Sequence, residues 1–257
     1  MEFRSVVCGV DETPAGAVAA DRAARIVTPT GLLTLVGVDE VLVGTGAMGA
    51  GAVIVPTPGA ARAAVDAAAA EVATLHGNVR TVVAEGVVMP AIHDAVAAHA
   101  GDLVVVGSHG GGRASGILLG STATYALHDA PCSVLVAREG RRDGWPASIA
   151  IGVDGSGPSL AAYDAAVGLA GRTGAAVRAI AAVPDLEHRA LERLRAAVAS
   201  LEETGDEAVD ALVAASHSVD LVVVGSRGLK GLRALGSVSE RVAHAATCSV
   251  LVVRTGT

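Results

Sequence analysis

The sequence predicts an α/β fold built from two tandem, doubly wound domains, each a parallel sheet flanked by helices. One pattern occurs twice: DLVVVG, a glycine-rich loop, then PCSVLV or TCSVLV, at Asp102–Val136 and Asp220–Val252. Apolar strand-like runs alternate with alanine-rich helical segments, which is typical of βαβ units with right-handed crossovers. A length of 257 residues suits two domains of about 100–150 residues each.

The first copy divides into five strands and four helices. Its strands are rich in Val, Leu and Ile, as in strands buried on both faces. They are expected at Ser5–Val10, Leu32–Val38, Asn78–Ala84, Asp102–Val106 and Ser133–Ala137. The helices are expected at Pro14–Val27, Ala60–Leu75, Pro90–His99 and from Gly120 onward. Thr13 suits the N-cap of the first helix, because its hydroxyl can accept a free amide, and Pro14 suits the first helical position.

The second copy follows the same order. Its strands are expected at Ser148–Val153, Ala176–Val183, Val198–Glu203, Asp220–Val224 and Ser249–Val253. Its helices are expected at Ser159–Arg172, Leu186–Ala196, Glu207–Ser216 and from Gly236. The polar, turn-rich stretch Arg138–Pro146 is the natural linker, so we expect domains at residues 1–140 and 147–257.

The first copy alone carries a segment from Val41 to Gly59. Within it Gly44–Gly49 reads GTGAMG and matches the GxGxxG pattern of dinucleotide sites. Such a loop must open a helix, whereas AGAVIVPTPG with two prolines follows here. We therefore expect a flexible loop. The uncharged run Val41–Ala61 holds five glycines and two prolines, which argues against a membrane span.

Composition excludes several classes of function. The chain is 51% hydrophobic, but only 2% of its residues are aromatic, so it lacks stacking platforms for single-stranded nucleic acid. A net charge of −7 disfavours nonspecific binding to nucleic acid or to anionic membranes. The three cysteines form no CxxC motif of a zinc or redox site. The start MEFRSVVCGV does not resemble a signal peptide, so we expect a cytoplasmic protein.

The two glycine-rich loops could each hold a phosphate group. Glycines let backbone N–H groups approach a ligand, and a helix start attracts anions. The first loop contains Gly107, Gly110 and Gly120–Ser121, and the second contains Gly225, Gly228 and Gly236–Ser237. Basic residues gather in both, namely His109 and Arg113, then Arg227, Lys230 and Arg233. The alternative interpretation is that the basic side chains are simply solvated and that the two serines are plain N-caps.

An aspartate ends the first strand of each copy, Asp11 and Asp154. Ligands of such sheets bind beyond the carboxyl ends of the strands. If the first and fourth strands are neighbours, each aspartate and its loop converge on one crevice, where the carboxylate could contact a ribose or a base edge. The alternative is a turn former before a helix. No Walker loop, Ser/His/Asp set or metal-ligand cluster is legible, and His93 and His109 stand alone.

These residues together resemble a tandem universal stress protein of the nucleotide-binding type. That family shows G-x2-G-x9-G-[ST] after the fourth strand, and Gly107, Gly110, Gly120 and Ser121 match it. The second copy has seven residues instead of nine between Gly228 and Gly236. The strand-1 aspartates also fit the family, as do the tails Cys132–Val136 and Cys248–Val252.

The resemblance implies five-stranded parallel sheets like those of adenine-nucleotide α-hydrolases, paired through strand 5 as an intramolecular pseudo-dimer. It implies an adenine nucleotide, usually ATP, with or without Mg²⁺, between strands 1 and 4, and a valine near the base. It leaves open a homodimer of the chain. The nucleotide-binding residues that it implies are Asp11, Val38, Gly107, Gly110, Gly120, Ser121, Thr122, Asp154, Val183, Gly225, Gly228, Gly236, Ser237 and Val238.

We therefore expect an ATP-binding stress-response protein that senses or signals through an unidentified partner and performs no catalysis. Neither nucleic acid nor a membrane is an expected partner. Two alternatives stay open: a ligand-free dimerisation module with vestigial loops, and a slow ATP hydrolase. The shorter second loop predicts that the second site binds the same ligand more weakly, because it moves the amides of the fourth helix relative to the phosphates.

Overall fold

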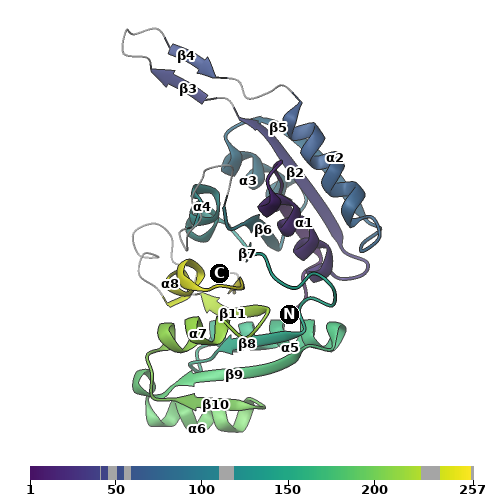
Figure 1. Cartoon of the computed structure of the whole chain (residues 1–257). Coiled ribbons are helices and arrows are strands. Elements are labelled where there is room, and N and C mark those ends of the chain that lie inside the picture. Colours follow the sequence, from purple (N-terminus) through teal and green to yellow (C-terminus); the bar gives the residue numbers. More distant parts are fainter. Residues whose placement is uncertain (41, 46–50, 55–58, 110–118, 227–237, 256–257) are drawn as a thin grey trace.

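One sheet of ten strands, with helices on both faces, forms the frame of the molecule (Figure 1). The structure is a computed structural model that describes residues 1–40, 42–45, 51–54, 59–109, 119–226 and 238–255. The strand order is β10-β9-β8-β11-β12-β7-β6-β1-β2-β5. Each half contributes five parallel strands, so the predicted fold class is confirmed.

The first half contains every element that its sequence predicts. Its parallel strands are β1 (Ser5–Gly9), β2 (Leu32–Glu40), β5 (Val79–Gly86), β6 (Leu103–Gly107) and β7 (Ser133–Ala137). Its helices are α1 (Pro14–Ile26), α2 (Ala60–Val72), α3 (Val88–Ala98) and α4 (Ser121–Asp129). Thr13 caps α1 as predicted, because its hydroxyl accepts the N–H of Gly16 at 3.2 Å.

The second half repeats the order of elements, with shorter second and third strands. Its strands are β8 (Ser148–Gly152), β9 (Ala176–Ala182), β10 (Leu201–Thr204), β11 (Leu221–Ser226) and β12 (Ser249–Arg254). Its helices are α5 (Gly157–Thr173), the 3-10 turn η1 (Val183–Asp185), α6 (His188–Ala197), α7 (Ala208–Ser216) and α8 (Val238–Ala245). The third strand of this half begins at Leu201, not at Val198, since α6 continues to Ala197.

The prediction of a loop over Val41–Gly59 is wrong for the part that the structure describes. Strands β3 (Leu42–Thr45) and β4 (Gly51–Ile54) pair antiparallel, and this hairpin extends away from the sheet beyond β2 (Figure 1). The physical reason is visible in the sequence, because LVGT and GAVI are short β-prone runs on either side of a glycine-rich connection. Gly44 of the GxGxxG match thus lies in a strand.

The helices form two layers that continue across both halves. Helices α1, α2, α5 and α6 share one apolar core with the sheet. Helices α3, α4, α7 and α8 share the other. Successive strand residues point to opposite faces, so in β1 the side chains of Val6 and Cys8 enter the first core and that of Val7 enters the second. Both faces are buried, and this explains the continuous apolar strands.

The two halves join through β7 and β12, as the resemblance implied. These strands pair antiparallel, with Leu135 opposite Leu251 at the centre of the contact. Just beyond the paired residues, the hydroxyl of Ser133 accepts the N–H of Arg254, and that of Ser249 accepts the N–H of Arg138, both at 3.1 Å. The contact is therefore pseudo-twofold, and it covers the valine-rich edge strand of each half.

Two arginines, the buried Arg138 and the partly buried Arg254, interlock the halves. Arg138 follows β7 and donates to the carbonyls of Ala243 in α8, at 2.6 Å, and of Cys248, at 3.4 Å. Arg254 ends β12 and donates to the carbonyls of Leu127 and Ala130 at the end of α4. Each arginine thus caps the last helix of the opposite half, where free carbonyls attract cations. Burial lowers the pKa of both guanidinium groups.

The aspartate of each DLVVVG run holds the start of its domain's first strand. Asp102 accepts the N–H groups of Arg4 and Ser5 at 2.7 and 3.2 Å. Asp220 accepts those of Ala147 and Ser148 at 2.8 and 3.1 Å. This duplicated carboxylate therefore serves strand pairing at the amino-terminal edge of the sheet, away from the ligand edge.

The three cysteine thiols should react slowly in the folded protein. Burial raises the pKa of Cys8, that of Cys132 to about 11 and that of Cys248 to about 12. Only the thiolate is a nucleophile, so a disulfide reagent at pH 7.5 is expected to label the native chain at least tenfold more slowly than the chain in guanidinium.

The same shifts give a direction for stability against pH. An unfolded thiol ionises near pH 8.5, whereas the folded Cys132 and Cys248 ionise near 11 and 12. The folded state therefore keeps the stability that comes from its neutral, buried thiols below about pH 8.5. It loses this contribution as the pH rises toward 12, because the unfolded thiols ionise first. Equal labelling rates in the native and unfolded chains would contradict the raised thiol pKa values on which both predictions rest.

Candidate functional site

The first and fourth strands are neighbours in both halves, as the fold rules predict. β1 pairs in parallel with β6, and β8 with β11. Their carboxyl ends therefore lie side by side, which brings Asp11 toward Gly107 in one half and Asp154 toward Gly225 in the other. Each aspartate thus lies at the same sheet edge as the start of its glycine-rich loop.

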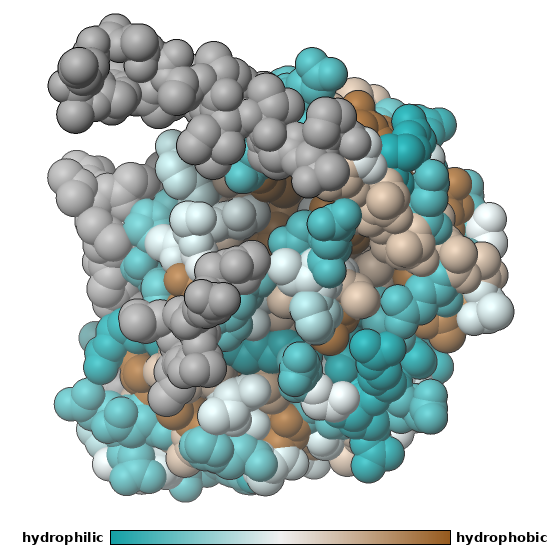
Figure 2. Space-filling model, turned by 45° about the horizontal axis from the view of Figure 1, so that its top comes forward, coloured by the Kyte–Doolittle hydropathy of each residue, from teal (hydrophilic) through white to brown (hydrophobic). Residues whose placement is uncertain are grey.

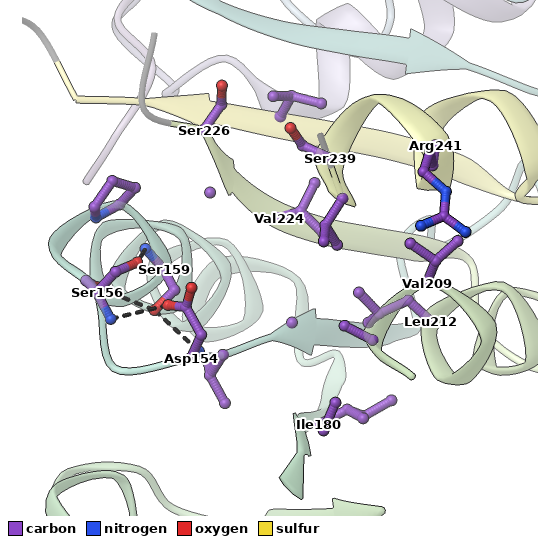
Figure 3. Close-up of a pocket in the computed structure, with 18 of the residues that line it drawn as sticks. Asp154, Ser156, Ser159, Ile180, Val209, Leu212, Val224, Ser226, Ser239 and Arg241 are labelled. Carbon is purple, nitrogen blue, oxygen red and sulfur yellow. Dashed lines mark hydrogen bonds between the residues drawn. The ribbon is translucent and has the colours of Figure 1, made fainter. Parts of the chain in front are cut away.

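A cavity of about 460 Å³ opens at this edge in the second half. Small-molecule sites are commonly about 300–1,000 Å³. The walls come from the turn after β8, the end of β9, the start of α7, the end of β11 and the start of α8 (Figure 3). The lining includes Gly152, Asp154, Ser156, Ile180, Ala182, Glu207, Leu212, Val224, Gly225, Ser226, Val238, Ser239, Glu240 and Arg241.

The cavity has an apolar interior and a polar rim. Ile180, Leu212 and Val224 are buried and line its inner wall (Figure 3). The hydroxyl-bearing residues Ser226 and Ser239 lie at the strand and helix ends that form another side. An apolar slot suits a flat ring system, and the polar ends of β11 and α8 suit sugar or phosphate oxygens.

Carboxylates predominate among the charged side chains that the structure describes around this cavity. Asp154, Glu207 and Glu240 line it, against the single guanidinium of Arg241. Arg227, Lys230 and Arg233, which the sequence offers as phosphate partners, lie outside the described residues. The described wall therefore gives the cavity a negative character near α7 and α8.

One wall depends on the other half of the chain. Leu127 of α4 lines the cavity, and the neighbouring His128 contacts Glu240, with Nε2 at 2.8 Å from Oε1. The two side chains are 17% and 12% exposed, so the pair is largely shielded from solvent. This contact joins the last turn of α4 to the first turn of α8.

Both strand-end aspartates organise the turn into the next helix. Asp11 accepts the N–H of Thr13 at 3.0 Å and the hydroxyl of the same residue. Asp154 accepts the N–H of Ser156 at 2.9 Å, and Ser156 in turn caps α5. The turn-forming interpretation is thus confirmed. It does not exclude a ligand contact, because both aspartates are exposed and Asp154 lines the cavity.

Gly107 and Gly225 let a helix start press against a strand end. A Cβ added at Gly225 would lie 2.3 Å from the carbonyl oxygen of Pro158, and one at Gly107 would lie 2.8 Å from that of Ala15. Real Cβ atoms do not approach backbone so closely, so the first turns of α5 and α1 need glycine there. These glycines therefore have a packing role besides any approach to a ligand.

The start of α4 presents amides at the ligand edge of the first half. Gly120 is the N-cap, and among the described residues no side chain caps this helix. The first helical bond runs from Thr124 N–H to the Gly120 carbonyl at 3.0 Å, so the amides of Ser121 and Thr122 precede the helical ladder. Ser121 is the first helical residue, and the plain N-cap interpretation is wrong for it.

In each half, the register of the second strand, β2 or β9, decides which of its residues lies at the ligand edge. Gly9 pairs with Val36 in the first half, and Gly152 pairs with Ile180 in the second. The position that matches Val38 is therefore Ala182, which lines the cavity, whereas Val183 begins the turn η1. A shift of one residue along a strand turns a side chain to the opposite face.

Some predicted residues cannot be placed and other lining residues were missed. Gly110, Gly228, Gly236 and Ser237 lie outside the described residues, while Val238 lines the cavity. A comparison of the two copies, aligned at Gly120-Ser121 and Gly236-Ser237, indicates Glu240 as a difference between the sites, because the first copy has Thr124 at that position. No pattern in the sequence indicates that Leu127 crosses to the second cavity.

Within the described residues, no group of three or more His, Cys, Asp or Glu side chains is placed to hold a metal ion. In that same part of the chain, no helix combines the length and apolar character needed to cross a membrane.

On the face in Figure 2, hydrophilic residues cover much of the described surface, with hydrophobic residues scattered among them.

Comparisons with known proteins agree with this architecture. The model of the universal stress protein family matches residues 2–138 and 189–254. A universal stress protein of Mycobacterium tuberculosis is 33% identical over 182 residues, which is 60% of this chain and 62% of the relative's length.

Two solved structures have the same fold along nearly the whole chain. A functionally unknown protein from Pseudomonas aeruginosa has a TM-score of 0.75 at 19% identity, covering 99% of this chain and 93% of that one. A universal stress protein from Archaeoglobus fulgidus has a TM-score of 0.71 at 17% identity, covering 98% and 96%. Because the family model matches residues in both halves and the sheet is built from two copies of the same five strands, the chain belongs to the universal stress protein family.

Proposed function

We propose that this protein binds an adenine nucleotide, ATP first among them, beyond the carboxyl ends of the first and fourth strands. Each repeat, residues 1–140 and 147–257, is one binding unit in this proposal. Binding serves sensing or signalling and not catalysis, and the partner that receives the signal is unidentified. The proposal includes a cytoplasmic location, with which the three unpaired thiols are consistent.

The observation that supports it most is the agreement between the cavity and the sequence motif. The repeated sequence pattern singles out Asp154 and Gly225, the family resemblance adds Val238, and all three line the 460 Å³ cavity. They come from three separate elements, so their convergence depends on the fold. The residues present also fit a nucleotide, since the apolar slot beside Ile180 and Leu212 can take the base.

Backbone amides at the helix starts are the groups proposed to hold the phosphates. In the first half these are the amides of Ser121 and Thr122, which precede the helical ladder of α4. In the second half they belong to the start of α8 at Val238 and Ser239. A helix start donates N–H groups and carries partial positive charge. Any Mg²⁺ is expected to arrive with the phosphates.

A bulky side chain at the end of β9 is expected to block the second site. Ala182 is buried and lines the cavity, so Ala182→Phe should place a ring in the proposed base slot and weaken ATP binding there by at least tenfold, about 1.4 kcal/mol. Isothermal titration calorimetry with ATP, ADP, AMP and cAMP measures the affinity and the number of sites.

The matched variant lies at the same register in the first half. Val38→Phe should weaken the first site and leave the second unchanged. Gly120→Val should also weaken the first site by at least tenfold, because a side chain there hinders approach to the α4 amides. ATP binding that is the same in all three variants and in the original chain would contradict the proposed sites.

The nucleotide itself can be identified without choosing a ligand beforehand. Protein purified without added nucleotide is heated, and the released small molecules are analysed by mass spectrometry. We expect adenine nucleotide in an amount comparable to the protein. If no nucleotide is released and none of the four binds in calorimetry, the ligand-free dimerisation module is favoured instead.

A further inference from the structure

The start of α7 carries a carboxylate at the place where the start of α3 is apolar. Leu212 of α7 packs over β8 in the same way as Ile92 of α3 packs over β1. This match sets the two helices in register, and Glu207 then corresponds to Val87. Each of these two residues is the N-cap of its helix, and Val87 is 66% exposed. The two halves therefore differ in chemistry at one position of the ligand edge.

Glu207 belongs to the wall of the second cavity that lies beside the proposed base slot. It lines the cavity, as do Val209 and Leu212, which follow it in α7 (Figure 3). In the proposed site the phosphates lie at the start of α8 and the ring lies beside Ile180 and Leu212. An edge of the base therefore faces the start of α7.

The Glu207 side chain is available to a ligand. It does not cap α7, and across the residues that the structure describes no hydrogen bond or ion pair holds it. The residue is exposed, so water solvates the carboxylate in the free chain. A base that covers this carboxylate must replace the water with an N–H donor, because an acceptor that is covered without a partner costs free energy.

We infer that Glu207 makes the second cavity selective for a base that carries an amino group, whose N–H the carboxylate accepts. Adenine fits this requirement, since its exocyclic amino group is a donor at the edge of the ring. The inference rests on the proposed function, because it concerns the same site. The side chain of Val87 cannot accept a hydrogen bond, so this selection belongs to the second site and not to the first.

Helix α7 itself supplies a matched control. A negative charge at a helix start also stabilises the helix, and this effect must be separated from a contact with the base. Asp210 is an exposed carboxylate in the first turn of α7 that does not line the cavity. Glu207→Val gives the second half the residue of the first half, and Asp210→Val removes the same charge from the same helix start. Glu207→Gln removes the charge but retains an oxygen that accepts hydrogen bonds.

The experiment measures by calorimetry the affinities for ATP and for purine riboside triphosphate, which has a hydrogen in place of the amino group. All proteins carry Gly120→Val to silence the first site, or Val38→Phe if that change prevents folding, and thermal melting confirms that each is folded. The parent should bind ATP at least tenfold more tightly than the analogue, because charged acceptors make strong hydrogen bonds.

The variants should change this ratio of affinities in a fixed order. Glu207→Val should lower it to about threefold or less, chiefly by weakening the binding of ATP. Glu207→Gln should give an intermediate ratio, and Asp210→Val should keep the ratio of the parent.

The possible outcomes separate this inference from the proposed function. A parent that binds the two compounds equally, or a ratio that Glu207→Val leaves unchanged, overturns the inference and leaves nucleotide binding intact. The same holds if Asp210→Val lowers the ratio as much as Glu207→Val does. If the parent binds neither compound, while the chain without Gly120→Val binds ATP at one site, the second site is lost and the inference with it. If that chain binds no ATP either, the proposed function fails too.

Discussion

The Gly225→Ala variant is expected to lower the free energy of unfolding by about 3 kcal/mol, because overpacking against backbone is costly. The new Cβ would lie 2.3 Å from the carbonyl oxygen and 2.4 Å from the carbonyl carbon of Pro158. Neither atom can rotate away, so the first turn of α5 must move from β11. Gly107→Ala meets Ala15 at 2.8 Å and should cost less, about 2 kcal/mol.

Urea unfolding followed by circular dichroism measures both variants. Gly171→Ala is the control, since it lies within α5 with nothing within 4 Å of its Cβ. Replacing that glycine should stabilise the chain by about 0.5–1 kcal/mol. If Gly225→Ala unfolds at the same urea concentration as the original chain, the glycine is not required for helix packing. Its repetition in the sequence would then point to the ligand alone.

The Arg138→Met variant is expected to lose about 2 kcal/mol of stability, as is Arg254→Met. Hydrogen bonds from charged donors are worth about 1.5–3 kcal/mol, and removing the guanidinium leaves buried carbonyls without a donor. For Arg138 those carbonyls are of Ala243 and Cys248, and for Arg254 they are of Leu127 and Ala130. Methionine retains the packing of the apolar part of the arginine side chain, so the loss of stability measures the contribution of the guanidinium hydrogen bonds.

Arg62→Met is the matched control on the surface. Arg62 is 58% exposed and pairs with Asp66 four residues along α2 at 3.9 Å, so its loss should change stability by less than about 0.5 kcal/mol. Thermal melting and urea titration serve as the measurements. An Arg138→Met protein as stable as Arg62→Met would show that the halves are held by the β7–β12 pairing and the apolar cores alone.

Much of the frame follows from local sequence. The apolar runs of Val, Leu and Ile, the proline after Thr13 and the duplicated DLVVVG each specify an element within a few residues. The rules for doubly wound sheets predict that the first and fourth strands are neighbours, and the pairing of β1 with β6 and of β8 with β11 confirms it. The glycines and prolines beyond β2 predict a loop, whereas the short apolar runs among them pair as β3 and β4.

The register between strands could not be predicted from the residues alone. The family resemblance implies Val183, whereas the pairing of β8 with β9 places Ala182 at the cavity. Local sequence does not specify which residues of two separated strands stand opposite, and a slip of one residue exchanges the faces.

The sequence by itself determined the duplication, the α/β class and the sheet edge at which Asp154 and Gly225 meet. These properties depend on local patterns and on general rules of chain topology. Only the tertiary structure decided that Leu127 lines the second cavity, that His128 contacts Glu240 in its wall, and that Arg138 and Arg254 cap each other's half. Such contacts join residues more than a hundred positions apart across a pseudo-twofold axis, and no local preference encodes them.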